Sequence, residues 1–132
     1  MKRFRFPLLA LLFVSLFALQ GCSSGGSGGG LAVGDDYKNL AGVWQDDDTK
    51  TSFTFVKSGD DMVLASAIDD DGEVFNIHSF EFLEGRLSWT YEVPSTGYFV
   101  TIIIMDMNNR TMNTVWGNSQ GNSGTGTFTK VK

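Results

Sequence analysis

Short segments of alternating side-chain character, separated by turn residues about every dozen positions, constrain this sequence most strongly. From Leu40 onward apolar residues recur at every second position, and we find no convincing helical period of 3.6. A period of two is that of a β-strand, in which successive side chains point to opposite faces. The sequence predicts eight strands: residues 41–45, 51–57, 62–68, 74–83, 86–93, 98–107, 111–117 and 125–131.

The connections between these segments are short and rich in Gly, Asn, Asp and Ser, which suit tight turns. Because short connections join antiparallel neighbours, the strands should form a meander. An open meander leaves two unpaired edges, and closing it into a barrel removes them. We therefore expect an all-β fold: an eight-stranded antiparallel up-and-down β-barrel. A two-sheet sandwich is the alternative.

The first 21 residues have the features of an export signal. Basic residues at positions 2, 3 and 5 precede an apolar run from Pro7 to Leu19, which is too short to span a bilayer comfortably. This order predicts a cleaved signal peptide over residues 1–21. Cleavage would also change the net charge of the chain. Three of the ten basic residues and none of the fifteen acidic ones lie in residues 1–21, so residues 22–132 have a net charge of −8. That acidity argues against nucleic acid as a partner.

The segment Leu19-Gln20-Gly21-Cys22 resembles the lipobox of bacterial lipoproteins, in which the chain is cut before an acylated cysteine. The resemblance implies palmitate-type lipidation of Cys22, and Ser23 resembles the choice that sorts lipoproteins to the outer membrane. Cys22 is the only cysteine, so no disulfide can form within the chain. We expect a lipid-anchored protein of the bacterial cell envelope, in the outer membrane. The alternative is a free cysteine beside an ordinary cleavage site.

A Gly/Ser-rich stretch follows the cysteine and includes the run of residues 25–30. Its conformational entropy disfavours folding. We interpret residues 22–39 as the lipidated cysteine and a flexible tether, and residues 40–132 as the barrel domain.

Two short motifs stand at the ends of that domain: Gly42-Val43-Trp44 in the first predicted strand and Thr127-Phe128-Thr129-Lys130 in the last. Together they resemble the calycin pattern shared by lipocalins and avidins. The resemblance implies a structural clasp of Gly42, Trp44 and Lys130, in which the lysine lies across the tryptophan and closes the base of the barrel. The lipocalin disulfide and the biotin-holding residues of avidins have no counterparts here, so the resemblance carries the fold and not biotin. The alternative is an unrelated β-meander with a core tryptophan.

Aromatic residues of two predicted strands should point into this lipocalin-like barrel. Phe53 and Phe55 share one face of the second strand, and Trp89 and Tyr91 share one face of the fifth. These four are candidates for lining a ligand cavity. The alternative is that they only fill the core, because a barrel of this size can be fully packed.

The alternation of apolar residues shifts by one position within the segment 74–83. Phe75 and Ile77 would be on one face of the strand, and Phe80 and Phe82 on the other. A β-bulge near His78 would reconcile the two halves. Because bulges re-aim side chains, His78 is a fifth candidate for ligand binding. The alternative is a structural, half-buried histidine, since one histidine without further ligands makes a poor metal site.

Acidic residues cluster in two predicted turns that an up-and-down meander places at the same end of the barrel. We expect them to form an acidic rim, facing away from the membrane: Asp46, Asp47, Asp48, Asp69, Asp70, Asp71 and Glu73. A negative mouth disfavours carboxylate ligands and favours a cationic or neutral ligand, or a basic protein. Residues 69–73 lack EF-hand spacing, so we interpret them as a turn and expect no metal and no cofactor. The alternative is that these residues only keep the turns solvated.

The sequence contains no nucleophile elbow, phosphate loop or metal-ligand cluster, so we expect a protein that is not an enzyme. The leading hypothesis is a membrane-anchored lipoprotein whose barrel binds a small apolar or neutral ligand. The alternative is a filled barrel that acts as a protein interaction or inhibitor module. That module would use the acidic rim and an apolar outer strand carrying Phe99, Ile103 and Met105.

Overall fold

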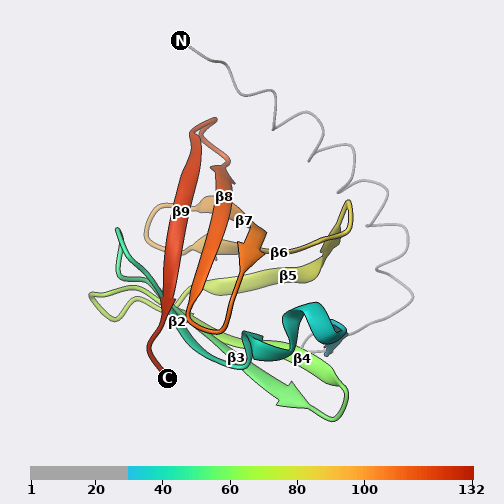
Figure 1. The fold of residues 1–132 in the computed structure, drawn as a ribbon. Coiled ribbons are helices and arrows are strands. Elements are labelled where there is room, and N and C mark those ends of the chain that lie inside the picture. The colour runs from blue at the N-terminus through green and yellow to red at the C-terminus, as the bar shows by residue number, and fades with distance from the viewer. Residues whose placement is uncertain (1–29) are drawn as a thin grey trace.

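The computed structural model describes residues 30–132, which form one antiparallel sheet that curls into a nearly closed β-barrel (Figure 1). The strands are β1 (Leu31–Ala32), β2 (Gly42–Asp46), β3 (Ser52–Ser58), β4 (Asp61–Ile68), β5 (Asn76–Leu83), β6 (Arg86–Val93), β7 (Tyr98–Met107), β8 (Thr111–Asn118) and β9 (Ser123–Lys130). A 3-10 helix, η1 (Asp35–Leu40), joins β1 to β2. The strand order is β1-β4-β3-β2-β9-β8-β7-β6-β5. Among the described residues, no helix has the length and apolar character to cross a membrane.

The all-β antiparallel barrel is confirmed, but the predicted count of eight strands is wrong. The described sheet has nine strands, because Leu31 and Ala32 pair with Met62 and Asp61 of β4. The other eight strands follow the predicted segments, and β6 and β7 have the predicted bounds. The register shift between Ile77 and Ser79 confirms the bulge expected at His78.

The last part of the predicted tether packs against the barrel. Val33 is buried, and the Tyr37 ring lies edge-on to Phe82 with 5.9 Å between their centroids. The Tyr37 hydroxyl also accepts a 3.4 Å hydrogen bond from the backbone N–H of Leu87. The folded domain therefore begins at least as early as Leu31. The predicted signal peptide, Cys22 and the start of the tether lie outside the described residues.

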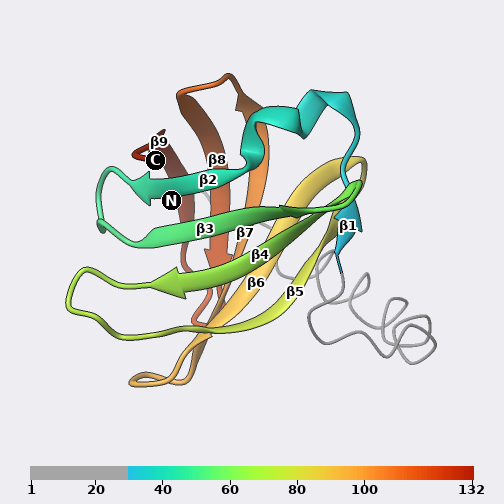
Figure 2. The same ribbon diagram turned by 90° about the horizontal axis from the view of Figure 1, so that it is seen from below.

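Backbone contacts close the barrel between β4 and β5 only beside the loop that joins these two strands. An isolated bridge joins Ile68 to Val74, and the N–H of Phe75 donates to the carbonyl of Ala67 at 2.9 Å. Toward the other end β1 occupies part of the free edge of β4. We call the end with the β2–β3, β4–β5, β6–β7 and β8–β9 loops the mouth, and the end with η1 the base. In Figure 2 the β2–β3 and β4–β5 loops project to the left, and η1 and β1 lie to the right.

Side chains pack the barrel tightly toward the base. Leu40, Trp44 and Leu87 are fully buried there, and the indole Nε1 of Trp44 donates to the Leu40 carbonyl at 2.8 Å. Gly42 adopts φ 133°, and a Cβ at this position would clash with the carbonyl oxygen of Lys132 and the side chain of Lys130. The strand ends of the base therefore approach one another as only glycine permits.

Candidate ligand-binding site

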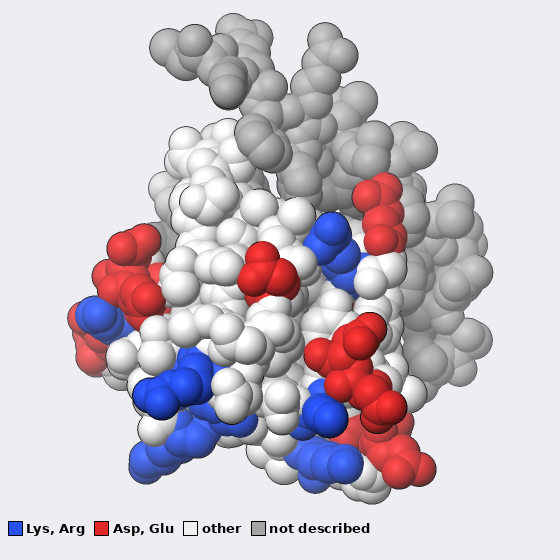
Figure 3. All heavy atoms as spheres, in the orientation of Figure 1, with Lys and Arg blue, Asp and Glu red and all other residues white. Residues whose placement is uncertain are grey.

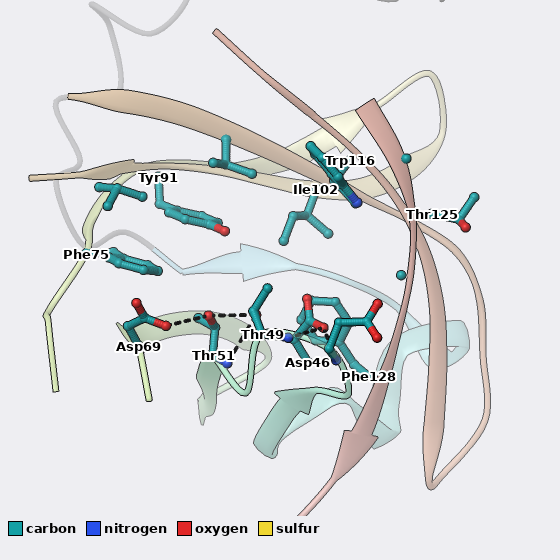
Figure 4. A pocket seen from close by; sticks show the side chains of 15 residues that line it. Asp46, Thr49, Thr51, Asp69, Phe75, Tyr91, Ile102, Trp116, Thr125 and Phe128 are labelled. Atoms are coloured by element: carbon teal, nitrogen blue, oxygen red, sulfur yellow. Dashed lines mark hydrogen bonds between the residues drawn. The ribbon is translucent and has the colours of Figure 1, made fainter. Parts of the chain in front are cut away.

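A cavity of about 430 Å³ opens at the mouth of the barrel. Figure 4 shows it from close by, with side chains from opposite walls pointing toward the space between them. Its volume lies within the range of small-molecule sites, and apolar surface predominates in its lining. The lining residues are Asp46, Asp48, Thr49, Thr51, Asp69, Phe75, Tyr91, Val93, Val100, Ile102, Trp116, Gly124, Thr125, Gly126 and Phe128.

Two glycines of β9 create room on one wall. Gly124 and Gly126 have the same parity as the buried Phe128, so they occupy the inner face where larger side chains would otherwise stand. A Cβ at Gly124 would lie 3.1 Å from the Trp116 indole, and a Cβ at Gly126 would lie 3.1 Å from Thr114 Oγ1. The Trp116 ring therefore lies against the backbone of β9, and the space in front of it stays open.

Aromatic rings make the floor and one side of the cavity. Phe75 and Tyr91 are stacked in parallel, with 4.9 Å between their centroids and an interplanar angle of 1°. The ring of Phe53, a buried core residue that does not line the cavity, has its centroid 5.4 Å from that of Tyr91 and 5.5 Å from that of Phe128. Such packed rings bury much apolar area and hold one another in place.

Three carboxylates at the mouth make the polar side of the cavity: Asp46 at the end of β2, Asp48 in the β2–β3 loop and Asp69 in the β4–β5 loop. Asp46 Oδ1 accepts the backbone N–H groups of Asp48 at 2.8 Å and Thr49 at 3.2 Å. Asp69 Oδ1 accepts the Thr51 hydroxyl at 3.3 Å, which ties the β2–β3 loop to the β4–β5 loop. Dashed lines in Figure 4 mark contacts of this network. Turn hydrogen bonds therefore hold the carboxylates of Asp46 and Asp69 in position.

The electrostatic effect of these charges reaches the Tyr91 hydroxyl. Burial raises the pKa of Tyr91 first of all, and the negative charges of Asp46 and Asp69 raise it further. The phenol is therefore neutral at physiological pH and can donate or accept a hydrogen bond.

Six of the seven residues of the predicted acidic rim lie in the β2–β3 and β4–β5 loops at the mouth, and Asp46 is the last residue of β2. Acidic atoms gather at the left edge of Figure 3, where these loops project. Carboxylate oxygens of Asp69, Asp71 and Glu73 come within 4.8 Å of one another. Glu73 accepts the backbone N–H of Ser95 at 2.7 Å and its hydroxyl at 2.9 Å, which joins the β4–β5 loop to the β6–β7 loop. Asp47 accepts the Thr129 hydroxyl at 2.8 Å. Glu73 and Asp47 thus connect the loops to neighbouring elements, while Asp46, Asp48 and Asp69 line the cavity.

Of the five residues that the sequence singles out for ligand binding, Tyr91 alone lines the cavity. Phe53, Phe55 and Trp89 are buried in the core, where the two phenylalanines lie 5.3 and 5.2 Å from Trp89 between ring centroids. The Trp89 indole N–H is buried without a hydrogen-bond acceptor among the described residues.

His78 lies on the outer surface of the barrel. Its side chain is 47% exposed, Nε2 lies 3.7 Å from Glu92 Oε1, and its ring centroid lies 4.9 Å from that of Phe99. The bulge thus directs His78 away from the interior. On the outer face of β7, Phe99 and Met105 are about 40% exposed, whereas Ile103 is buried.

The residues of the predicted clasp meet at the base, at the opposite end from the cavity. Trp44 and Lys130 are register partners, and Lys130 Nζ lies 5.6 Å from the centroid of the Trp44 ring. The same ammonium donates to the Asn39 carbonyl at 2.9 Å. The lysine therefore covers the core tryptophan and holds the end of η1.

The cavity is also lined by residues that were not predicted to bind a ligand: Phe75, Thr51, Trp116, Gly124 and Gly126. A usable signal was present in Gly124 and Gly126, because alternate glycines on the parity of Phe128 indicate a hollow inner face. The predicted strand began at residue 125, which left Gly124 in a loop and concealed this alternation.

No protein-family model and no curated protein matches this sequence. Among solved structures, the crystal structure of Tp0751 (pallilysin) from Treponema pallidum is similar, with a TM-score of 0.48 and 13% sequence identity. The alignment covers 75% of this chain and 84% of that one. A likeness this distant carries no functional argument.

Proposed function

We propose that this protein is a lipid-anchored bacterial envelope protein whose barrel binds a small ligand with a largely apolar body at its mouth. The cavity carries this proposal, because it combines about 430 Å³ of space with aromatic walls and a few fixed polar groups. A calycin-type relationship belongs to the same proposal, and the position of Lys130 over Trp44 supports it.

The anchor is proposed from the resemblance to a lipobox around Cys22 and is tested separately from ligand binding. Metabolic labelling with an alkyne analogue of palmitate, in a bacterial host, should mark the wild-type protein and place it in the outer-membrane fraction. Cys22→Ser should lose both the label and the membrane association. Equal labelling of the variant, or a wild-type protein that stays soluble in the periplasm, would contradict the proposed anchor.

Ligand binding is tested by filling the cavity. A neutral dansyl amide with a pentyl chain should show a blue-shifted emission with the purified wild-type protein, because the probe enters an apolar site. Val100 lines the cavity, so Val100→Phe should weaken binding by about tenfold or more. Met105→Phe adds an aromatic ring to the exposed outer face of the same strand and is the matched control. Equal affinity of the two variants would argue against the cavity as the site.

The alternative, an interaction module that acts through the acidic rim and the outer face of β7, predicts a different pattern. Recovery of a basic protein partner would fall in the triple variant of Asp69, Asp70 and Asp71 to Asn, while Val100→Phe would have no effect. The open cavity favours ligand binding, because a filled barrel would leave no such space.

A further inference from the structure

We propose that the cavity selects ligands that carry a positively charged amine on an apolar body, with Asp46 and Asp69 receiving the ammonium. This inference rests on the proposed ligand-binding function and names the chemical class of its ligand. It follows from the distribution of charge around the cavity, the neighbouring aromatic surfaces and the fixed geometry of the loops.

The charges that face the cavity all have one sign. Three of the fifteen lining residues are aspartates, and none of the fifteen is a lysine or an arginine. Across residues 30–132, neither Asp46 nor Asp69 forms a salt bridge within 4.0 Å. A ligand carboxylate would be repelled at this position, whereas an ammonium group would neutralise charge that the protein leaves uncompensated.

The carboxylates have acceptor capacity left for a ligand. In both Asp46 and Asp69 the hydrogen bonds of the loops use Oδ1, and Oδ2 accepts no hydrogen bond from a described residue. An ionised carboxylate can accept several hydrogen bonds through its two oxygens. An ammonium donor could therefore bind without breaking the network that holds the loops.

Aromatic rings lie close to these charges. The Tyr91 ring and hydroxyl are near enough to Asp46 and Asp69 for both charges to raise the pKa of the phenol. Figure 4 places Asp46 and Asp69 on one side of the cavity and Tyr91, Ile102 and Trp116 on the other. A cation between them would gain attraction from the carboxylates and from the face of the Trp116 ring that borders the cavity, and its apolar body would cover the walls.

The acceptors are already in place before a ligand arrives. Thr49 Oγ1 donates to Thr51 Oγ1 at 2.9 Å, and Thr51 donates to Asp69, so the two loops form one network. Thr51 is buried, and its backbone carbonyl also accepts the N–H of Asp46 at 2.8 Å. A preorganised site spends little binding energy on ordering its own loops.

The test uses three dansyl probes that share one body and one five-carbon chain. The chain ends in an ammonium in dansylcadaverine, in a methyl group in the neutral amide and in a carboxylate in the third probe. We expect the ammonium probe to bind at least about tenfold more tightly than the neutral probe, and the carboxylate probe to bind most weakly. Raising the salt concentration should reduce the advantage of the ammonium.

Two variants with the same change of charge locate the effect. Asp69→Asn keeps Oδ1 as an acceptor for Thr51 and should remove most of the preference for the ammonium probe while leaving the neutral probe unchanged. Asp70→Asn alters the next residue, which is exposed and does not line the cavity, and should keep the preference.

Equal binding of all three probes would overturn the inference and leave the proposed ligand-binding function standing. An equal loss in both variants would show a diffuse surface effect and would also overturn it. If none of the probes binds, both proposals fail. Displacement of dansylcadaverine by calcium at millimolar concentration would indicate a metal site in place of an amine site and would count against the inference.

Discussion

The base and the mouth of this barrel are built from the same strands, yet one is packed and the other is hollow. At the base the inner face of β2 carries the buried Trp44, and Gly42 lets the chain ends close around it. At the mouth the inner face of β9 carries Gly124 and Gly126, and a cavity opens in front of Trp116. Glycine therefore has opposite consequences at the two ends.

This difference shows that the effect of a glycine depends on what occupies the place of the side chain that it lacks. At Gly42 the backbone carbonyl of Lys132 and the Lys130 side chain fill the position of the absent Cβ. At Gly124 the Trp116 ring lies flat against the backbone, and the volume in front of the ring stays empty. The base thus contributes stability, and the mouth offers a binding surface.

The largest expected effect comes from removing a tryptophan at each end. Trp44→Ala should lower the free energy of unfolding by about 3–5 kcal/mol, because it opens a void in the packed base. Trp116→Ala should lower it by about 1 kcal/mol, since the ring already borders an open cavity. Urea unfolding followed by circular dichroism measures both. Equal losses would contradict the contrast between the two ends, whereas Trp116→Ala should affect probe binding far more than stability.

Replacing one glycine at each end with alanine compares how much stability the protein loses when a single methyl group is added there. Gly42→Ala should cost about 2–3 kcal/mol, because it combines a positive φ with a clash against backbone. Gly124→Ala has no positive φ, and the Trp116 ring can shift into the cavity, so we expect a cost below about 1 kcal/mol and weaker probe binding. Thermal unfolding and probe titration separate the two outcomes. A Gly124→Ala protein as unstable as Gly42→Ala would show that the mouth is as tightly packed as the base.

The lysine of the clasp should contribute less than the packing around it. Lys130→Met keeps an apolar stem over Trp44 but removes the hydrogen bond to the Asn39 carbonyl, and we expect a loss of about 1 kcal/mol. Lys57→Met, at an exposed position of β3, removes the same charge and should change stability by less than about 0.5 kcal/mol. Indistinguishable denaturation midpoints for the two variants would show that the clasp does not stabilise the base.

Tyr91 should make the protein sensitive to alkaline pH. Its pKa is raised in the folded state above the value of 10.0 for a free tyrosine, so the stabilisation by the neutral phenol is present below about pH 10 and is lost as the pH rises further. Between about pH 8 and pH 11 the wild type should lose about 1 kcal/mol more stability than Tyr91→Phe. Urea titrations at both pH values measure this difference. Tyr98→Phe, which alters an exposed tyrosine, should behave like the wild type.

Much of the fold follows from local sequence features, and β6 and β7 show why. Their alternation is strong, and turn residues bound both segments, so the predicted limits match the observed ones. The bulge at His78 was also predictable, because a change of parity within one strand requires an extra residue. By contrast, β1 has only two residues and η1 is a 3-10 helix, and neither is long enough to show a period.

The candidate site was harder to predict. The alternation along a strand shows which face of the sheet a side chain is on, but not how far it lies from the mouth of the barrel. Trp89 and Tyr91 share the inner face of β6, yet Trp89 lies in the packed core and Tyr91 reaches the cavity. The depth depends on where the strands end and on which loops meet, as Thr51 and Asp69 do. The acidic end of the barrel was predictable from topology, but the hollow beside it required the three-dimensional placement of Trp116 and the β9 glycines.

The most direct test of a binding mouth above a packed base is a nuclear magnetic resonance titration of the purified, ¹⁵N-labelled protein with dansylcadaverine. We expect chemical-shift changes at the backbone amides of Phe75, Tyr91 and Gly126, and unchanged signals at Gly42 and Trp44. Shift changes concentrated at His78, Phe99 and Met105 on the outer face, with the cavity residues unaffected, would contradict it.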